Sequence, residues 1–283
     1  MKVRGDGYRF VIPALILLSL VTVYPLVYVF YLSLYRRLLI FDISRFVGFE
    51  NYLFIFRDDR FWNALKNTIY FTVTSVSLEL LLGLFIAILL NRTFRFKGMM
   101  RAIILIPWAI PTVVSAKMWE WMYNTDFGVL NYLLGMKINW LGSPFWAMNA
   151  AIFMDVWKTT PFVTILLMAG LQVIPQEIYR AARVDGAGIF AIFRKITLPL
   201  LKPVILVVLL FRTLDAFRVF DAIYVLTGGG PANTTETLSI YAYKVLFQTL
   251  QFGYGSALSV VIFLCIGSIS IFYIRLLSKG IKQ

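Results

Sequence analysis

Residues 68–90 read TIYFTVTSVSLELLLGLFIAILL, and Glu79 is the only charged residue among them. A helix of about 20 mostly apolar residues is long enough to cross the roughly 30 Å hydrocarbon core of a bilayer. This stretch therefore predicts a membrane span, and lipid is then the solvent for part of the protein surface.

Five more stretches of similar length and composition lie on either side of it. They are residues 10–34, 99–123, 145–173, 204–226 and 257–277. The first is about twice as long as the apolar region of a signal peptide and lacks a small-residue cleavage site, so we interpret it as a retained span. We expect an all-α membrane protein with six transmembrane helices, forming one transmembrane domain over residues 1–283. We also expect a short surface helix around residues 59–66.

Composition supports this class and excludes others. The chain is 60% hydrophobic and 14% charged, whereas a soluble domain carries about a quarter charged residues. The net charge of +13 is spread over short clusters between apolar runs, which indicates lipid headgroups and not nucleic acid as the partner. With no histidine and one cysteine, Cys265, the chain has no His-dependent catalytic or zinc site and no intramolecular disulfide. We expect no catalytic residue and no metal site.

The distribution of lysine and arginine predicts the orientation. Fifteen lysine and arginine residues fall on the side of the membrane that carries both termini, and eight fall on the opposite side. The fifteen are Lys2, Arg4, Arg9, Arg92, Arg95, Lys97, Arg101, Arg180, Arg183, Arg194, Lys195, Lys202, Arg275, Lys279 and Lys282. The eight are Arg36, Arg37, Arg45, Arg57, Arg60, Lys66, Lys137 and Lys244. Because positive loops stay inside, both termini should be cytoplasmic.

The longest inward loop, residues 174–203, reads IPQEIYRAARVDGAGIFAIFRKITLPLLKP. Pro175 interrupts the fourth span, and residues 176–184 suit a short helix. Ala181 and Ala182 give that helix a low-relief patch that another backbone could approach closely. Asp185-Gly186 signals a turn or helix break, and a second short helix would follow it.

This loop resembles the cytoplasmic EAA loop of permease subunits in binding-protein-dependent ABC importers. The positions that match the family pattern are Ala181, Ala182, Asp185, Gly186, Ala187, Leu198, Pro199, Leu201 and Pro203. Arg180 stands where the family has a glutamate. Residues 48–52, 60–68 and 226–237 look like the carbohydrate branch of that family, and within it the maltose-type first permease.

The resemblance implies a type I ABC importer permease architecture in a prokaryotic inner membrane, with the loop acting as a coupling helix on a separate ATPase. The coupling residues would be Glu177, Arg180, Ala181, Ala182, Asp185, Gly186 and Ala187. This chain would hold no cofactor, because ATP and magnesium bind the ATPase. The partners would be a second permease forming a heterodimer, two copies of the ATPase, and an extracytoplasmic sugar-binding protein. The alternative for the loop is an amphipathic helix lying on the lipid surface.

Charged residues inside the spans have two interpretations. A charge at mid-bilayer costs about 2.5–3.5 kcal/mol, so each should face the bundle interior, water or a partner. In the first interpretation, they line a polar path for a hydroxylated substrate. The lining residues would then be Asp155, Lys158, Thr159, Phe162, Asp215 and Arg218. Residues 212, 215, 218 and 221 would continue as one drifting face of the fifth span. Alternatively, these charges pair between helices and only hold the permeases together.

Two other functional classes compete with an ABC permease. An ion-driven secondary transporter predicts internal inverted repeats, and the chain shows no such self-similarity. An intramembrane enzyme is disfavoured because histidine is absent and no nucleophile constellation is recognisable. The glycines at 228–230 are not followed by Gly-Lys-Ser/Thr, so they do not form a P-loop.

Overall fold

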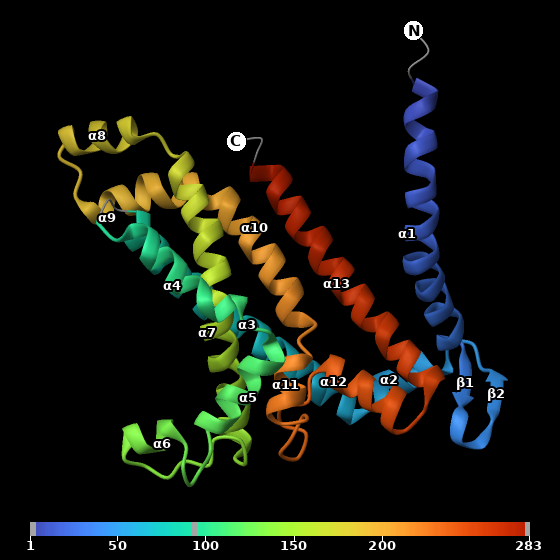
Figure 1. Cartoon of the computed structure of the whole chain (residues 1–283). Helices are drawn as coiled ribbons and strands as arrows, with labels where there is room; N and C mark the ends of the chain where they lie inside the picture. The colour runs from blue at the N-terminus through green and yellow to red at the C-terminus, as the bar shows by residue number, and fades with distance from the viewer. Residues whose placement is uncertain (1–3, 92–94, 281–283) are drawn as a thin grey trace. The chain divides into compact units, whose positions relative to one another are not determined.

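The computed structural model describes residues 4–91 and 95–280 (Figure 1). The basic residues Lys2, Arg92 and Lys282 of the orientation tally lie outside the described residues. In chain order the elements are α1 (Arg4–Ser33), β1 (Tyr35–Leu38), η1 (Leu39–Phe41), β2 (Ile43–Phe46), α2 (Glu50–Arg57), α3 (Asp59–Asn91), α4 (Lys97–Ala109), α5 (Thr112–Met122), α6 (Val129–Leu134), α7 (Pro144–Val173), α8 (Gln176–Val184), α9 (Ile189–Ile192), η2 (Phe193–Thr197), α10 (Leu198–Phe217), α11 (Asp221–Leu226), α12 (Leu238–Tyr243), η3 (Lys244–Gln248) and α13 (Phe252–Gly280).

Among the described residues, five helices are long and apolar enough to cross a membrane, and the number is six when the bent pair Lys97–Ala109 and Thr112–Met122 is counted as one span. The expected helical architecture with six spans is therefore confirmed. The described chain forms two compact units, one of residues up to 62 with 241–264 and one of residues 63–240 with those from 265 on. The expectation that residues 1–283 form one domain stays a prediction.

The first unit contains a short antiparallel hairpin that the sequence analysis missed. β1 pairs with β2 in the register Tyr35↔Phe46 to Leu38↔Ile43. Strands of four residues with no clean alternation give only a weak periodic signal. Asp58 joins the two chain segments of this unit, because its Oδ2 accepts hydrogen bonds from the hydroxyls of Tyr241 and Tyr254.

In the second unit, the core lies along α7. One buried cluster joins α7 to α5, α11 and α12, and another joins it to α3 and α10. The contact with α3 depends on Gly83, because a Cβ atom there would lie 2.6 Å from Cγ1 of Val163. This close approach brings the backbones of α3 and α7 together near the polar groups described below.

The third span is not the single helix expected over residues 99–123. It is divided into α4 and α5, whose axes differ by 90°. The backbone leaves the helical conformation at Ile110 (ψ 132°) and Pro111 (ψ 140°). A residue before proline is driven out of the α region, and proline donates no hydrogen bond, so the helix ends there.

The fifth span also differs from the expected residues 204–226. It begins earlier, at Ile189, includes α9, η2 and α10, and ends at Phe217, while α11 is a separate helix. The apolar residues of α11 pack into the protein core, and hydropathy does not distinguish such a buried segment from the end of a span. Consequently Asp221 does not continue the face that carries Arg212 and Asp215, whereas Arg218, directly after α10, still contacts Asp215.

The short surface helix was placed at the wrong residues. The structure has it at Glu50–Arg57, whereas residues 59–66 form the first turns of the long helix α3. Asp58 interrupts the two helices with an extended backbone (φ −88°, ψ 104°), and its Oδ1 accepts a hydrogen bond from the amide of Arg60 at 2.9 Å. An aspartate that caps the start of a helix in this way is a common N-terminal signal.

Candidate functional site

The loop between α7 and α10 forms a short helix with defined ends. α8 begins directly after Pro175 and ends at Val184, as expected from the sequence. At its end, the amide of Ala187 donates to the carbonyl of Ala182 at 2.9 Å, and that of Gly186 to Arg183 at 3.1 Å. Gly186 has φ +78°, a conformation that glycine adopts without the steric penalty of a side chain. The Asp-Gly pair therefore fixes the direction in which the chain leaves α8.

Most of this loop is exposed. Glu177, Arg180, Ala181, Asp185 and Gly186 are exposed, Ala187 is half-buried, and Ala182 is buried. Three apolar side chains next to them are also largely uncovered: Val184 (88%), Ile189 (84%) and Phe190 (74%). Apolar groups gathered at one exposed loop mark an interaction surface. Figure 1 shows α8 and α9 beyond the ends of α7 and α10.

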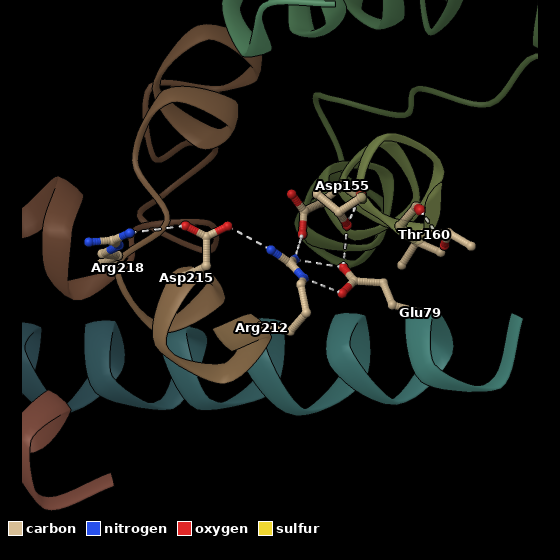
Figure 2. A network of polar contacts seen from close by, with 8 residues as sticks. Glu79, Asp155, Thr160, Arg212, Asp215 and Arg218 are labelled. Carbon is tan, nitrogen blue, oxygen red and sulfur yellow. Dashed lines mark hydrogen bonds and ion pairs between the residues drawn. The ribbon is translucent and has the colours of Figure 1, made fainter. Parts of the chain in front are cut away.

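A second group of polar side chains forms a network of contacts inside the second unit (Figure 2). The Arg212 guanidinium of α10 contacts three carboxylates. Nε lies 2.5 Å from Oε2 of Glu79 on α3, Nη2 lies 3.1 Å from Oδ2 of Asp155 on α7, and Nη1 lies 2.6 Å from Oδ2 of Asp215. The hydroxyl of Thr159 lies 2.7 Å from Oε1 of Glu79. We call Glu79, Asp155, Thr159, Arg212 and Asp215 the charge network.

The charge network joins three spans. Arg212 and Glu79 are almost completely buried, and Asp155 is buried on α7. The network is exposed at one end, where Asp215 is half-exposed. Oδ1 of Asp215 lies 3.4 Å from Nη2 of Arg218. A buried charge is stable only when it is paired and hydrogen-bonded. The network therefore fixes the packing of α3, α7 and α10 and presents one carboxylate at its edge.

Lys158 and Phe162 lie at a different place, the break between α4 and α5. Nζ of Lys158 donates to the carbonyl of Ile110 at 2.7 Å and approaches that of Trp108 at 3.4 Å. The ring of Phe162 stacks on Trp108 with centroids 5.7 Å apart. The bend leaves the last carbonyls of α4 without helical partners, and a cation at a helix C-terminus is favourable. Lys158 thus supplies the missing donor.

The six residues expected to line one path therefore form two groups. Asp155, Thr159, Asp215 and Arg218 belong to or adjoin the charge network, and Lys158 and Phe162 belong to the helix break. Their role in a substrate path stays a prediction. The set of expected site residues omitted Glu79 and Arg212, although a lone carboxylate in the middle of residues 68–90 is itself a signal that a partner exists.

Within residues 4–91 and 95–280, no group of three or more His, Cys, Asp and Glu residues could hold a metal ion. The carboxylates of the charge network are occupied by Arg212.

Comparison with known proteins identifies the family. Residues 79–283 match the family described as binding-protein-dependent transport system inner membrane component. The chain is 45% identical over 273 residues to the trehalose/maltose transport system permease protein MalF of Thermococcus litoralis, covering 95% of this chain and 92% of the relative. It is 42% identical to the sulfoquinovosyl glycerol transport system permease protein SmoG of Agrobacterium fabrum, covering 94% of this chain and 88% of the relative.

The solved structures agree on the fold. A chain of a bacterial ABC transporter involved in the import of the acidic polysaccharide alginate superposes with a TM-score of 0.84 at 22% identity, covering 96% of this chain and 94% of that one. A second structure of the alginate transporter, in complex with an alginate pentasaccharide-bound periplasmic protein, gives a TM-score of 0.82, also at 22% identity, and covers 94% and 91%. The family match, the relatives and the fold together show that this chain belongs to the inner membrane components of binding-protein-dependent transport systems, the permease subunits of ABC transporters.

Proposed function

We propose that this permease moves a sugar or oligosaccharide into the cell and is driven by separate ATPase subunits that contact α8. The substrate class is supported by its relatives, which are named as transport permeases for trehalose/maltose, sulfoquinovosyl glycerol and trehalose. We place both termini in the cytoplasm on the strength of the lysine and arginine distribution.

The observation that carries the coupling proposal is the exposure of the α8 loop combined with its rigid ends. Pro175 and Gly186 define where α8 begins and ends, and the hydroxyls of Tyr179 and Thr197 lie 3.3 Å apart, which links α8 to η2 at the base of the fifth span. A force applied to α8 is therefore passed to α7 and α10 together. Rigid-body motion of packed helices is a common switching mode.

Each loop residue has a role in this proposal. The exposed apolar groups Val184, Ile189 and Phe190 would be covered by the ATPase, and Ala181 leaves room for a close backbone. Glu177 and Arg180 place charges of opposite sign on the exposed side of α8. Because Arg180 replaces the family glutamate, we expect a carboxylate on the ATPase surface facing it.

The assembly in this proposal contains this chain, a second permease, two ATPase subunits and an extracytoplasmic sugar-binding protein. The chain itself is not an enzyme, and ATP with magnesium would bind the ATPase subunits. A periplasmic protein bound to a sugar is present in the structure of the related alginate transporter, which supports the last partner. The complex would lie in the inner membrane of a prokaryotic cell.

The test uses two glycines of the same loop. Gly186 has φ +78°, whereas Gly188 has φ −69° and ψ 164°, and a Cβ atom at either would meet nothing within 4 Å. Gly186→Val forces a β-branched residue into a left-handed conformation, which costs about 1–3 kcal/mol, and should redirect α9. Gly188→Val keeps a conformation that valine readily adopts.

We expect Gly186→Val to reduce ATP-dependent uptake of trehalose or maltose at least about tenfold, which corresponds to about 1.4 kcal/mol of lost coupling, and to weaken copurification of the ATPase. Gly188→Val should leave both close to wild type. If Gly186→Val changes neither uptake nor copurification, α8 is not the coupling element. Uptake driven by an ion gradient without the ATPase would instead favour a secondary transporter.

A further inference from the structure

The position of α2 is restricted at both of its ends by membrane spans of the first unit. Near its start, Nδ2 of Asn51 donates to the carbonyl of Ser33, the last residue of α1, at 2.7 Å. Directly after its end, Oδ2 of Asp58 accepts a hydrogen bond from the hydroxyl of Tyr254, near the start of α13, at 2.5 Å. Both ends of α2 therefore lie close to the ends of spans, the last residue of α1 and the first turn of α13.

The hairpin is held at the same level. β1 begins at Tyr35, two residues after α1 ends, and a residue extends the chain by at most about 3.6 Å. The amide of Leu39 donates to the carbonyl of Leu250 at 3.2 Å, and Leu38 bridges to Gln251, next to the start of α13. The hairpin, drawn in blue at the lower end of α1 in Figure 1, is therefore held at the ends of two spans, at the boundary between membrane and water.

Both elements expose apolar side chains at that boundary. The hairpin tip carries Leu39, Ile40 and Phe41, and Phe41 is 71% exposed. Phe49, directly before α2, and Leu53 and Phe56 on it are exposed and recur at the spacing of one helical face. We call these six residues the interfacial anchor. Helices that lie on membranes bury such a face about 5–10 Å into the boundary between headgroups and acyl chains.

The hairpin also brings two positive charges together. Arg36 and Arg45 are direct cross-strand partners, and both are exposed. Like charges placed opposite one another destabilise a strand pair. Within the described part of the chain, neither guanidinium has a carboxylate at ion-pairing distance. The pair therefore has room for an external anion, and a phosphate is the group that guanidinium donors bind in a bidentate manner.

We propose that the interfacial anchor lies in the headgroup layer of the bilayer, with its apolar side chains among the acyl chains and with Arg36 and Arg45 on a phospholipid phosphate. Lipid fits better than a protein partner because apolar and basic groups occur together at the depth of the headgroups, where arginine is favoured with its charge at the phosphates and its stem in the apolar layer. The anchor would fix the outer ends of α1 and α13 relative to the membrane plane.

Spin labelling tests the location. Cys265 is the only cysteine, so Cys265→Ala followed by single cysteines at Phe41, Phe56 or Arg57 places one label in each protein. Arg57 lies on α2 beside the apolar face and serves as the matched control. The assembled transporter is placed in nanodiscs of phosphatidylethanolamine and phosphatidylglycerol, and collisions with oxygen and with a water-soluble nickel complex are measured.

We expect the ratio of oxygen to nickel collisions at positions 41 and 56 to exceed that at position 57 at least about threefold, because the apolar face lies deeper in the bilayer. High nickel accessibility at 41 and 56 would place the anchor in water and overturn the proposal. Labels shielded from both reagents, and immobilised only when the partner subunits are present, would show that protein covers it, which overturns it equally.

The arginine pair is tested by the change Arg36→Gln with Arg45→Gln. In phospholipid nanodiscs, the collision ratio of the label at position 41 should fall by about half, because the phosphate contact is lost. In a maltoside detergent, which has no phosphate, the same change should leave the label unaltered or more ordered, since a like-charge contact is relieved. Arg57→Gln is the control in both media. If the change alters the collision ratio at position 41 equally in lipid and in detergent, the arginine pair does not bind a lipid phosphate.

Discussion

At the scale of single residues, Arg212 is the side chain on which the charge network depends. It pairs with the buried carboxylates of Glu79 and Asp155, and it also contacts the more exposed Asp215. Removing one partner of a buried ion pair leaves an uncompensated charge, and this is more harmful than the pair itself is stabilising. The charge network therefore makes the packing of α3, α7 and α10 dependent on one side chain.

Replacing Arg212 with methionine should destabilise the folded protein by about 3–5 kcal/mol, because buried carboxylates lose their counter-charge. Thermal unfolding of the detergent-purified protein measures this. The matched control is Arg218→Met, which removes an exposed arginine that also contacts Asp215 and should change stability by about 1 kcal/mol or less. Similar effects of the two changes would show that burial of the network is not what stabilises the spans.

Asp215 distinguishes a substrate path from a purely structural network. Its carboxylate is the exposed edge of the network, with 56% of the side chain accessible. If it hydrogen-bonds to sugar hydroxyls, Asp215→Asn should alter uptake of some sugars much more than others while the subunits still assemble. Losing a hydrogen bond to a charged group corresponds to about 1.5–3 kcal/mol, or tenfold and more in apparent affinity. A uniform decrease for every sugar, together with failed assembly, would favour the structural role.

At the scale of helices, the break in the third span is stabilised by side chains of α7. Proline interrupts the backbone between α4 and α5, and Lys158 on α7 supplies the donor that the freed carbonyls of Trp108 and Ile110 lack. Phe162, one turn further along α7, packs on Trp108. The bend is thus stabilised from a neighbouring span and does not depend on the third span alone.

Lys158→Met should destabilise the bent pair by about 1.5–3 kcal/mol, the contribution of hydrogen bonds from a charged donor. Lys158→Arg keeps a cationic donor and should restore most of it. Cysteine labelling rates at Ala109, next to the break, report the local change, and thermal unfolding reports the global one. A labelling rate that is the same in wild type, methionine and arginine variants would show that Lys158 does not hold the bend.

At the scale of the whole molecule, the chain has the features of a part of an assembly. α1 exposes apolar side chains between Val11 and Tyr31, and the α8 loop exposes Val184, Ile189 and Phe190. Lipid covers the first surface or shares it with another subunit, and in the proposed coupling the ATPase covers the exposed side chains of the α8 loop. Transport should therefore require other chains.

This chain reconstituted alone in proteoliposomes should show no ATP-dependent sugar uptake above the background of empty vesicles. Adding the second permease, the ATPase and the binding protein should restore it, because force on α8 must come from outside the chain. Omitting each component in turn identifies which ones are required. Concentrative uptake by the isolated chain would contradict an ATP-driven permease.

Much of this molecule follows from local sequence. Apolar stretches determine where spans occur, because no lipid-exposed backbone is stable unless it is helical. Pro175 and the Asp185-Gly186 pair determine α8, since proline and left-handed glycine impose their own backbone angles. In these cases the cause acts within a few residues, so α8 was predicted with the bounds that the structure has.

Only the tertiary structure decided which charges meet and where apolar runs stop being spans. Glu79 and Arg212 are 133 residues apart, and their pairing depends on how closely α3, α7 and α10 pack. The end of the fifth span at Phe217 was missed because α11 is apolar for a different reason, its burial against α5 and α7. Hydropathy reports how apolar a segment is, but whether lipid or protein covers it is determined by contacts between segments distant in the sequence.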